Sequence, residues 1–314
     1  MKKSILYLIT LGTLLAGCNS NNNDINTSSN NKSSSINTSF SSNISNEDNI
    51  EEVDVIVMAG QSNMEGHSWV DKLYSNTDTS MHSNYRNGFE NTNIAYYCND
   101  GSNYSDTFVP VKVGQGYGIG SFGPEIGIAE ELYNRDYEKP VYLIKYALGG
   151  TNLYSQWNVN NEESLYYYMV DFVYDQLAYL EEQDLKPIIR GFFWMQGEAD
   201  ACWLQGANQY YENLSNMVDA FREEFEHFYG DEDKGISFVD AGISDCDTWV
   251  YHNIVNNEKK DFAASNPEKN YYFDTMENGL EYKYDNTDYY HYDATSEIKL
   301  GKLFVSTLLD NNWM

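Results

Sequence analysis

A serine follows the first strongly apolar stretch of the chain, in the segment GQSNM at residues 60–64. Residues 53–59 are rich in Val and Ile and predict a buried strand, so Ser62 comes directly after a strand end. A serine hydroxyl becomes a nucleophile only when a base accepts its proton and a third group orients that base. Ser62 is therefore either a nucleophile or the N-cap of a following helix, and the rest of the chain must decide.

One of the five histidines has the surroundings of a catalytic base. His291 lies in the segment DYYHYD, just before an expected helix, and Asp288 precedes it by three residues. In a turn, this spacing lets the Asp288 carboxylate reach the near ring nitrogen while the far nitrogen points outward. An Asp-x-x-His pair is a weak signal alone, because a polar loop that caps the last helix has a similar composition.

Two further segments have groups that can stabilise an oxyanion. A glycine pair at 149–150 follows the apolar residues 140–147, and glycine lets a backbone N–H approach a ligand without obstruction by a Cβ. The segment WMQGEAD places the amide of Gln196 and the carboxylate of Glu198 after another apolar run. Glycine pairs also make turns, and Gln also caps helices, so neither segment is specific alone.

The elements that must position these residues alternate between strands and helices. Such alternation predicts a parallel sheet with helices on both faces, and ligands bind at the carboxyl ends of its strands. The polar, Tyr- and Gly-rich residues 70–118 are expected to form a long loop over that edge, within one domain at 50–314. The expected strands are 53–59, 140–147, 187–195, 236–241 and 271–274, and the expected helices are 123–134, 163–183, 210–228 and 294–309.

Composition excludes some classes of partner. The chain has 48 acidic and 19 basic residues, a formal net charge of −29. Such a surface repels nucleic acid, so a DNA- or RNA-binding role is disfavoured. The 28 tyrosines combine an apolar ring with a polar tip, which suits sugar surfaces, but a compositional bias shared with Asn, Ile and Lys explains their number equally well.

The N-terminal residues predict export. A basic start and an apolar run at 5–15, too short to span a bilayer, end in Leu-Ala-Gly-Cys. Residues 1–18 resemble a bacterial lipoprotein signal peptide, in which Cys18 becomes the lipidated first residue. An ordinary secretory signal would also export the protein. Residues 19–49 are mostly Asn and Ser and predict a disordered tether, so we expect an extracytoplasmic, membrane-anchored lipoprotein.

The remaining cysteines give no sign of a metal centre. Cys98, Cys202 and Cys246 form no CxxC pair and no Cys/His cluster, so no metal is expected. Export permits one disulfide, but the odd number leaves at least one thiol free, and the sequence does not choose the pair.

Five segments taken together resemble the SGNH (GDSL-type) hydrolase superfamily. They are most similar to its carbohydrate-esterase branch, the sialate O-acetylesterases and family 6 acetylxylan esterases, and they span residues 53–305 in the family's order. The segments are GQSNMEG, GPEIGIAEEL, KYALGGTNL, WMQGEAD and DYYH. The resemblance implies a three-layer α/β/α sandwich with a central parallel sheet, the flavodoxin-like SGNH hydrolase fold.

The resemblance also implies an activity and a set of roles. It implies a serine esterase that removes O-acetyl groups from an acetylated polysaccharide or sialic acid through an acyl-enzyme, without a cofactor. Ser62 matches the nucleophile, His291 the base and Asp288 the carboxylate that orients it. Glu198 matches an acid that supports the histidine instead of Asp288 or alongside it, so the third triad member stays open.

Three groups match the oxyanion donors of the family: the backbone N–H of Ser62, the backbone N–H of Gly150 and the side-chain amide of Gln196. The nucleophile elbow of α/β-hydrolases is excluded, because its G-x-S-x-G pattern needs a small residue where Met64 stands. Two rival functions remain: a lipase or thioesterase on the same scaffold, and a catalytically inactive glycan-binding lipoprotein.

Overall fold

The computed structural model describes residues 50–229, 235–282 and 288–314. These residues lie in one compact unit that begins at Glu47. The predicted signal peptide at 1–18, its Cys18 and the predicted tether at 19–49 lie outside the described residues. Within the described ranges, no helix has the length and apolar character needed to cross a membrane.

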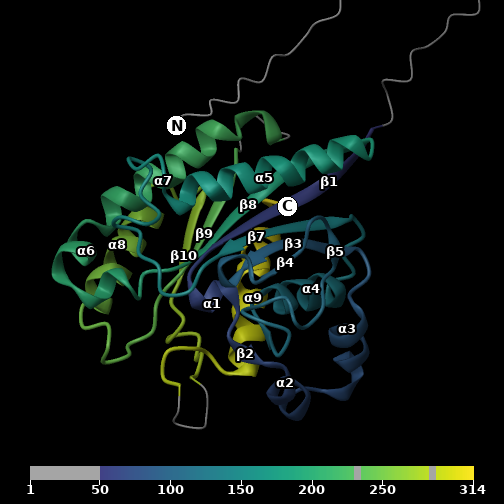
Figure 1. Ribbon diagram of the computed structural model, residues 1–314, viewed down its shortest axis with the longest axis horizontal. Coiled ribbons are helices and arrows are strands. Elements are labelled where there is room, and N and C mark those ends of the chain that lie inside the picture. Colours follow the sequence, from purple (N-terminus) through teal and green to yellow (C-terminus); the bar gives the residue numbers. More distant parts are fainter. Residues whose placement is uncertain (1–49, 230–234, 283–287) are drawn as a thin grey trace, which may run out of the picture. The chain divides into compact units, whose positions relative to one another are not determined.

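A mostly parallel sheet of eight strands runs through the described part of the unit (Figure 1). Its order is β10-β9-β8-β1-β7-β3-β4, and β5 also pairs with β3. The pairs from β10 to β3 are parallel, whereas β4 and β5 run antiparallel to β3. The strands are β1 (Glu51–Gly60), β3 (Thr92–Cys98), β4 (Asn103–Tyr104), β5 (Val109–Pro110), β7 (Val141–Ala147), β8 (Leu185–Met195), β9 (Ser237–Ala241) and β10 (Asn270–Phe273).

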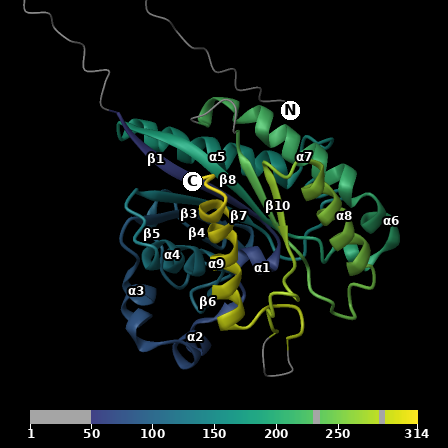
Figure 2. The same ribbon diagram turned by 180° about the vertical axis from the view of Figure 1, so that it is seen from behind.

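Helices cover both faces of this sheet. The helices α5 (Leu165–Glu182), α7 (Tyr210–Glu224) and α8 (His252–Ser265) lie on one face (Figure 1). The opposite face carries α4 (Glu125–Asn134) and α9 (Ala294–Asp310), and α9 is seen in front in Figure 2. The three layers confirm the sandwich predicted from the alternation of strands and helices. The shorter elements are α1 (Ser62–Glu65), α2 (Val70–Asn76), α3 (His82–Asn87), α6 (Leu204–Asn208), the 3-10 turns η1 (Thr79–Met81), η2 (Asn99–Gly101), η3 (Asp200–Cys202) and η4 (Glu226–Phe228), and a two-stranded ribbon of β2 (Ser68–Trp69) and β6 (Ser121–Phe122).

The central strand β1 shows why the sheet forms from these residues. Its run from Val53 to Ala59 is buried on both faces, as expected for a strand between two parallel neighbours and under two helical layers. Asp54 is the polar exception, and its carboxylate accepts hydrogen bonds from Arg190 Nε at 2.6 Å and from the Tyr137 hydroxyl. The buried charge is therefore paired rather than left unsatisfied.

Two contacts hold α4 in place, one with α9 and one with the sheet. Gly127 on α4 and Gly301 on α9 let the two helices touch through their backbones, because a Cβ on Gly127 would stand 2.0 Å from the Ile298 carbonyl oxygen. At the start of α4, the fully buried Glu125 carboxylate accepts a 2.9 Å hydrogen bond from Lys145 Nζ of β7. This pair ties α4 to the sheet.

The expected strands and helices are confirmed with shifts of a few residues at their ends, but the long loop predicted at 70–118 is wrong. This segment contains α2, α3 and the strand β3, which lies inside the sheet between β7 and β4. The strand has only seven residues, TNIAYYC, and its flanking Asn residues give it the composition of a turn-rich loop. The helix α8 also went unpredicted, because its sequence HNIVNNEKKDFAAS is mostly polar.

Candidate active site

Ser62 opens the short helix α1 directly after β1. Gly60 and Gln61 make the turn between the two elements, and the Gln61 carbonyl accepts the N–H groups of Met64 and Glu65 at 2.9 and 2.8 Å. The backbone N–H of Ser62 donates to no acceptor among the described residues, as expected for the first turn of a helix. Ser62 is 8% exposed, and it lines a cavity of about 570 Å³.

Asp288 and His291 form the pair that their spacing predicts. The Asp288 carboxylate contacts His291 Nδ1 at 2.8 Å through one oxygen. Its other oxygen accepts the backbone N–H groups of Tyr290 and His291 at 3.0 and 3.2 Å. One carboxylate therefore holds both the ring and the loop that carries it, and His291 lines the same cavity as Ser62.

Asn63, the residue after the serine, connects three parts of the site. Its Nδ2 donates to Glu198 Oε1 at 2.9 Å and to the Tyr290 carbonyl oxygen at 3.2 Å, and its Oδ1 accepts the Tyr292 N–H at 3.4 Å. Glu198 is 2% exposed, and burial raises the pKa of its carboxyl. Glu198 thus reaches the histidine loop through Asn63, while Asp288 contacts the histidine directly.

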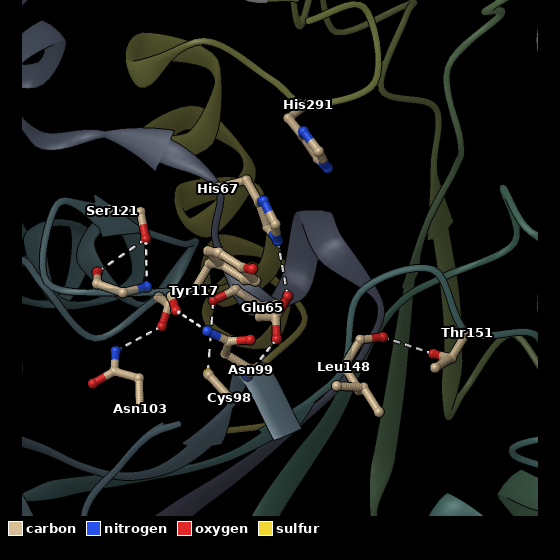
Figure 3. Close-up of polar contacts among 12 residues, drawn as sticks. Glu65, His67, Cys98, Asn99, Asn103, Tyr117, Ser121, Leu148, Thr151 and His291 are labelled. Atoms are coloured by element: carbon tan, nitrogen blue, oxygen red, sulfur yellow. Dashed lines mark hydrogen bonds and ion pairs between the residues drawn. The ribbon is translucent and has the colours of Figure 1, made fainter. Parts of the chain in front are cut away.

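A stack of rings lies against the histidine (Figure 3). The rings of His67 and His291 are nearly parallel, with centroids 4.3 Å apart and planes at 12°. Tyr117 packs against His67 at 4.6 Å, and the buried Glu65 carboxylate holds His67 Nε2 at 2.8 Å. The other Glu65 oxygen accepts the Asn99 N–H at 2.6 Å. The face of the His291 ring is therefore restrained by an anchored neighbour, and its edge is restrained by Asp288.

The glycine pair after β7 borders the same cavity. Gly150 has φ +72°, a conformation that favours glycine, and its N–H donates to no described acceptor. The loop is fixed on both sides: Leu148 N–H donates to the Gly60 carbonyl, and Trp157 Nε1 donates to Thr151 Oγ1. Two backbone N–H groups, from Ser62 and Gly150, are thus available beside one cavity.

Gln196 lies beneath this loop and is fully buried. Its amide nitrogen donates to Asp200 Oδ2 at 2.7 Å, to the Thr151 carbonyl at 3.0 Å and to Gln61 Oε1 at 3.3 Å. The Tyr210 hydroxyl donates to its amide oxygen at 3.0 Å. The residues that line the cavity include Gln61 and not Gln196, so the role of Gln196 as an oxyanion donor stays a prediction.

Aromatic side chains form much of the cavity wall. Tyr117, Trp249 and Tyr290 line it, and the rings of Trp249 and Tyr290 lie 5.6 Å apart. Glu65 and Glu198 supply carboxylates, while the described lining contains no Lys or Arg. No group of His, Cys, Asp and Glu in the described ranges has the arrangement of a metal site.

The sequence did not single out several of these residues. His67 lies just before the segment 70–118 that was expected to be a loop, and neither its stacking on His291 nor the Glu65 contact has a local signature. Trp249 lies in the loop between β9 and α8, far along the chain from the serine. Asn63 stands inside the GQSNM segment, so its proximity to Ser62 was the one available signal.

Residues 52–310 match the sequence profile of a family described as carbohydrate esterase, sialic acid-specific acetylesterase. This match confirms the resemblance that the five segments carry. A comparison with curated protein sequences gave no match.

Solved structures show the same fold. A protein from Arabidopsis thaliana has a TM-score of 0.60 at 18% identity, and the match covers 83% of this chain and 99% of that one. NanS has a TM-score of 0.55 at 13% identity, covering 83% and 98%. A carbohydrate acetylesterase from Xanthomonas citri has a TM-score of 0.50 at 14% identity, covering 81% and 55%. At these identities the likeness bears on the fold alone, and it confirms the fold class predicted from the sequence.

Proposed function

The chain belongs to the carbohydrate esterase family of sialic acid-specific acetylesterases, and from this membership we propose a serine esterase that removes O-acetyl groups from carbohydrate. The observation that carries the proposal is the grouping of Ser62, Gly150 and the Asp288-bound His291 around one cavity. A nucleophile, a base held by a carboxylate, and free backbone N–H groups are the parts that acyl transfer requires.

In the first half of the reaction, the Ser62 hydroxyl attacks the ester carbonyl and His291 accepts its proton. Asp288 holds Nδ1 of the ring, which directs the other nitrogen to the proton and stabilises the imidazolium that forms. The oxyanion of the tetrahedral intermediate accepts hydrogen bonds from the Ser62 and Gly150 N–H groups. His291 then protonates the sugar oxygen as the C–O bond breaks, which leaves acetyl on Ser62.

In the second half, water takes the place of the sugar. His291 accepts a proton from the water as its oxygen attacks the acyl carbonyl, and returns that proton to Ser62 when acetate leaves. The same donors stabilise the second oxyanion. The residues assigned to these steps supply every proton transfer, and no cofactor is part of the proposal.

The N-terminal residues add a cellular location to the proposal. The lipobox-like end at Cys18 and the Asn/Ser-rich residues 19–49 support a globular esterase tethered to the outer side of a bacterial membrane, where acetylated glycans are accessible. Labelling with a radioactive fatty acid in a bacterial host, compared between the parent and a Cys18→Ala variant, tests the anchor. Equal labelling of the two proteins would exclude it.

The decisive experiment is acetate release from a panel of acetylated glycans that includes O-acetylated sialic acid and acetylated xylan. The parent should release acetate from at least one glycan. Ser62→Ala should release none while its melting temperature stays close to that of the parent, because the hydroxyl has no hydrogen-bond partner among the described residues. Full activity in Ser62→Ala would remove the mechanism.

The role of Gln196 needs its own test. If its amide turns to the oxyanion during the reaction, Gln196→Ala should cost on the order of 3 kcal/mol in transition-state stabilisation. Its contacts with Asp200 and Thr151 predict a loss of stability as well, so kcat is compared at a temperature where urea titration shows the variant folded. A kcat within threefold of the parent would exclude Gln196 as a donor.

A further inference from the structure

A second groove, of about 490 Å³, lies between α5 and the edge strands β3 and β4. Four aromatic residues line it: Tyr97, Tyr104, Phe172 and Tyr179. Tyr104 is 55% exposed, so its ring is accessible to a ligand. None of these residues lines the catalytic cavity, and the proposed reaction does not use them.

Three of the four rings of this groove, those of Tyr97, Phe172 and Tyr179, pack against neighbouring aromatic rings. Tyr97 stacks on Tyr146 with centroids 4.8 Å apart and planes at 4°, and Phe172 packs against both rings. The ring centroids of Tyr179 and Phe108 lie 6.1 Å apart. Rings fixed in this way lose little freedom when a ligand packs on their other side, so the groove is preorganised. Flat apolar faces with polar tips match the C–H faces and hydroxyl edges of sugar rings.

A buried amide in the groove lacks a partner. Gln176 lines the groove although it is 4% exposed, and its Oε1 is a buried oxygen that accepts no hydrogen bond from any described residue. Buried polar groups are nearly always hydrogen-bonded, so an unpaired one on the wall of a groove indicates a place for an external donor. This oxygen has almost no accessible surface in the present side-chain conformation, so a sugar hydroxyl supplies the missing donor once the Gln176 amide turns toward the groove.

The charges of the groove restrict the ligand. Asp106, Asp175 and Glu182 line it, and they accept hydrogen bonds from hydroxyl groups but repel a polyanion. The same holds for the catalytic cavity, where Glu65 and Glu198 stand in a described lining without Lys or Arg. The net charge of −29 strengthens this repulsion at longer range.

The groove and the catalytic cavity both border the carboxyl end of β3. Tyr97 of β3 lines the groove, and Asn99, two residues further along the chain, lines the catalytic cavity. Tyr97 also stacks on Tyr146, which lies at the end of β7 shortly before Leu148 and the glycine pair of the cavity. A chain of sugar rings that leaves the cavity past Asn99 would therefore meet the ring of Tyr97.

From these observations we propose that the groove binds the main chain of a neutral acetylated polysaccharide, while an acetyl group further along that chain occupies the catalytic cavity. The proposal rests on the proposed esterase function and adds a substrate class to it: a neutral polymer in place of a sialic acid, whose carboxylate would meet acidic walls in both places. The groove supplies affinity for the polymer and takes no part in the bond changes at Ser62.

The first test compares polymer and small-ester kinetics. Tyr104→Ala should raise KM for acetylated glucomannan by about threefold to tenfold, as expected for the loss of one aromatic contact of about 1 kcal/mol. Its kcat/KM for p-nitrophenyl acetate should equal that of the parent, because this small ester does not reach the groove. Tyr271→Ala, which removes a 42% exposed tyrosine on the far edge strand β10, is the matched control and should change neither.

Gln176→Leu separates binding from folding. The substitution removes an amide whose oxygen has no described partner and keeps its volume, so thermal stability should be retained or raised while KM for the polymer rises. A parent-like KM for the polymer in both Tyr104→Ala and Gln176→Leu would overturn the proposal that the groove binds the polysaccharide. Acetate release by the parent would still support the proposed esterase function.

A binding assay decides the proposal without catalysis. In native gels that contain deacetylated glucomannan, the parent and Tyr271→Ala should be retarded, and Tyr104→Ala should migrate faster than both. Polygalacturonate, a polyanion, should retard none of them. Equal retardation of parent and Tyr104→Ala, or stronger retardation by polygalacturonate, would overturn the proposal even if no acetylated substrate were turned over.

Discussion

Asp200 joins the glycine loop to Gln196, and its replacement by asparagine should weaken both the fold and the site. The side chain is fully buried. One carboxylate oxygen accepts the Leu153 N–H at 2.8 Å and the Gln196 amide at 2.7 Å, and the other accepts the Tyr154 N–H at 2.9 Å. The loop that includes Gly150 is thereby attached to the residue that follows β8.

The expected loss in the free energy of unfolding follows from the number of hydrogen-bond donors around residue 200. In the Asp200→Asn variant the side chain keeps one acceptor oxygen, so its NH₂ group faces either the Tyr154 N–H or the pair formed by Leu153 and Gln196. In the better orientation one hydrogen bond to a charged group is lost, which costs about 1.5–3 kcal/mol. Burial raises the pKa of the Asp200 carboxyl, so removing the charge offsets part of that cost. We expect the free energy of unfolding to fall by about 1–3 kcal/mol.

The same change should slow catalysis. A displaced loop moves the Gly150 N–H away from the proposed oxyanion position, and misplacement of a catalytic donor by a fraction of an ångström costs about tenfold or more in kcat. The assays are guanidinium unfolding followed by tryptophan fluorescence, and acetate release at a temperature where the variant is folded. Asp310→Asn is the control, because its carboxylate is 62% exposed and its ion pair with Arg135 should contribute little. An Asp200→Asn protein with parent stability and parent kcat would refute the reasoning.

Three further predictions concern the walls of the site. His67→Ala should lower kcat for an activated acetate ester by about tenfold with little change in KM, because the face of the His291 ring loses its support. His67→Phe keeps a flat ring there and should retain most of kcat; equal losses would contradict a role in stacking. Burial raises the pKa of Glu198 above its ordinary 4.5, so this carboxyl favours folding at acid pH and opposes it as pH rises through the raised value. The melting temperature of Glu198→Gln relative to the parent should therefore increase from pH 4.5 to pH 8, and a constant difference would contradict the buried titration. A bulky maleimide should react with Cys202 at the cavity and block acetate release, whereas Cys98, whose pKa burial raises to about 12, should stay unmodified in the native protein. Activity in Cys202→Ser should survive the reagent, and inhibition of that variant would place the reactive thiol elsewhere.

Much of the site could be predicted because local sequence determines it. Ser62 follows a strand whose apolar run is unambiguous, and Asp288 reaches His291 through a three-residue turn that needs no distant contact. The position of Gly150 follows from another apolar strand, since parallel strands end at one edge of the sheet. Each of these residues is placed by an element that its own neighbourhood encodes.

The direction of the Gln196 side chain could not be predicted from the local sequence. The end of β8 was predictable, but the amide turns toward Asp200 and Thr151 because those acceptors are brought there by the fold. His67 is a similar case, because its contact with His291 joins residues more than 200 positions apart. Side-chain directions that depend on such partners cannot be derived from residue spacing.

The strand β3 was missed for a different reason. Its residues TNIAYYC are partly polar, and its place in the sheet depends on pairing with β7 and with the short antiparallel strands β4 and β5. A buried strand can carry Asn and Thr where neighbouring strands satisfy them, so periodicity alone underestimates it. Because β3 was not predicted, the groove could not be predicted either: Tyr97 of β3 and Tyr104 of β4 line it.

The GQSNM segment does more than supply the proposed nucleophile. Gly60 allows β1 to approach β8 so closely that a Cβ there would stand 2.1 Å from the Met195 carbonyl oxygen. Asn63 bonds to Glu198 and to the backbone beside His291, so the residue next to the serine also positions the loop of the base. We therefore expect the distance between the proposed nucleophile and the proposed base to depend on Asn63, the side chain adjacent to Ser62. Because that side chain is anchored on a carboxylate at the end of β8, a shift of the sheet edge would move Ser62 and His291 together, and their mutual geometry would persist.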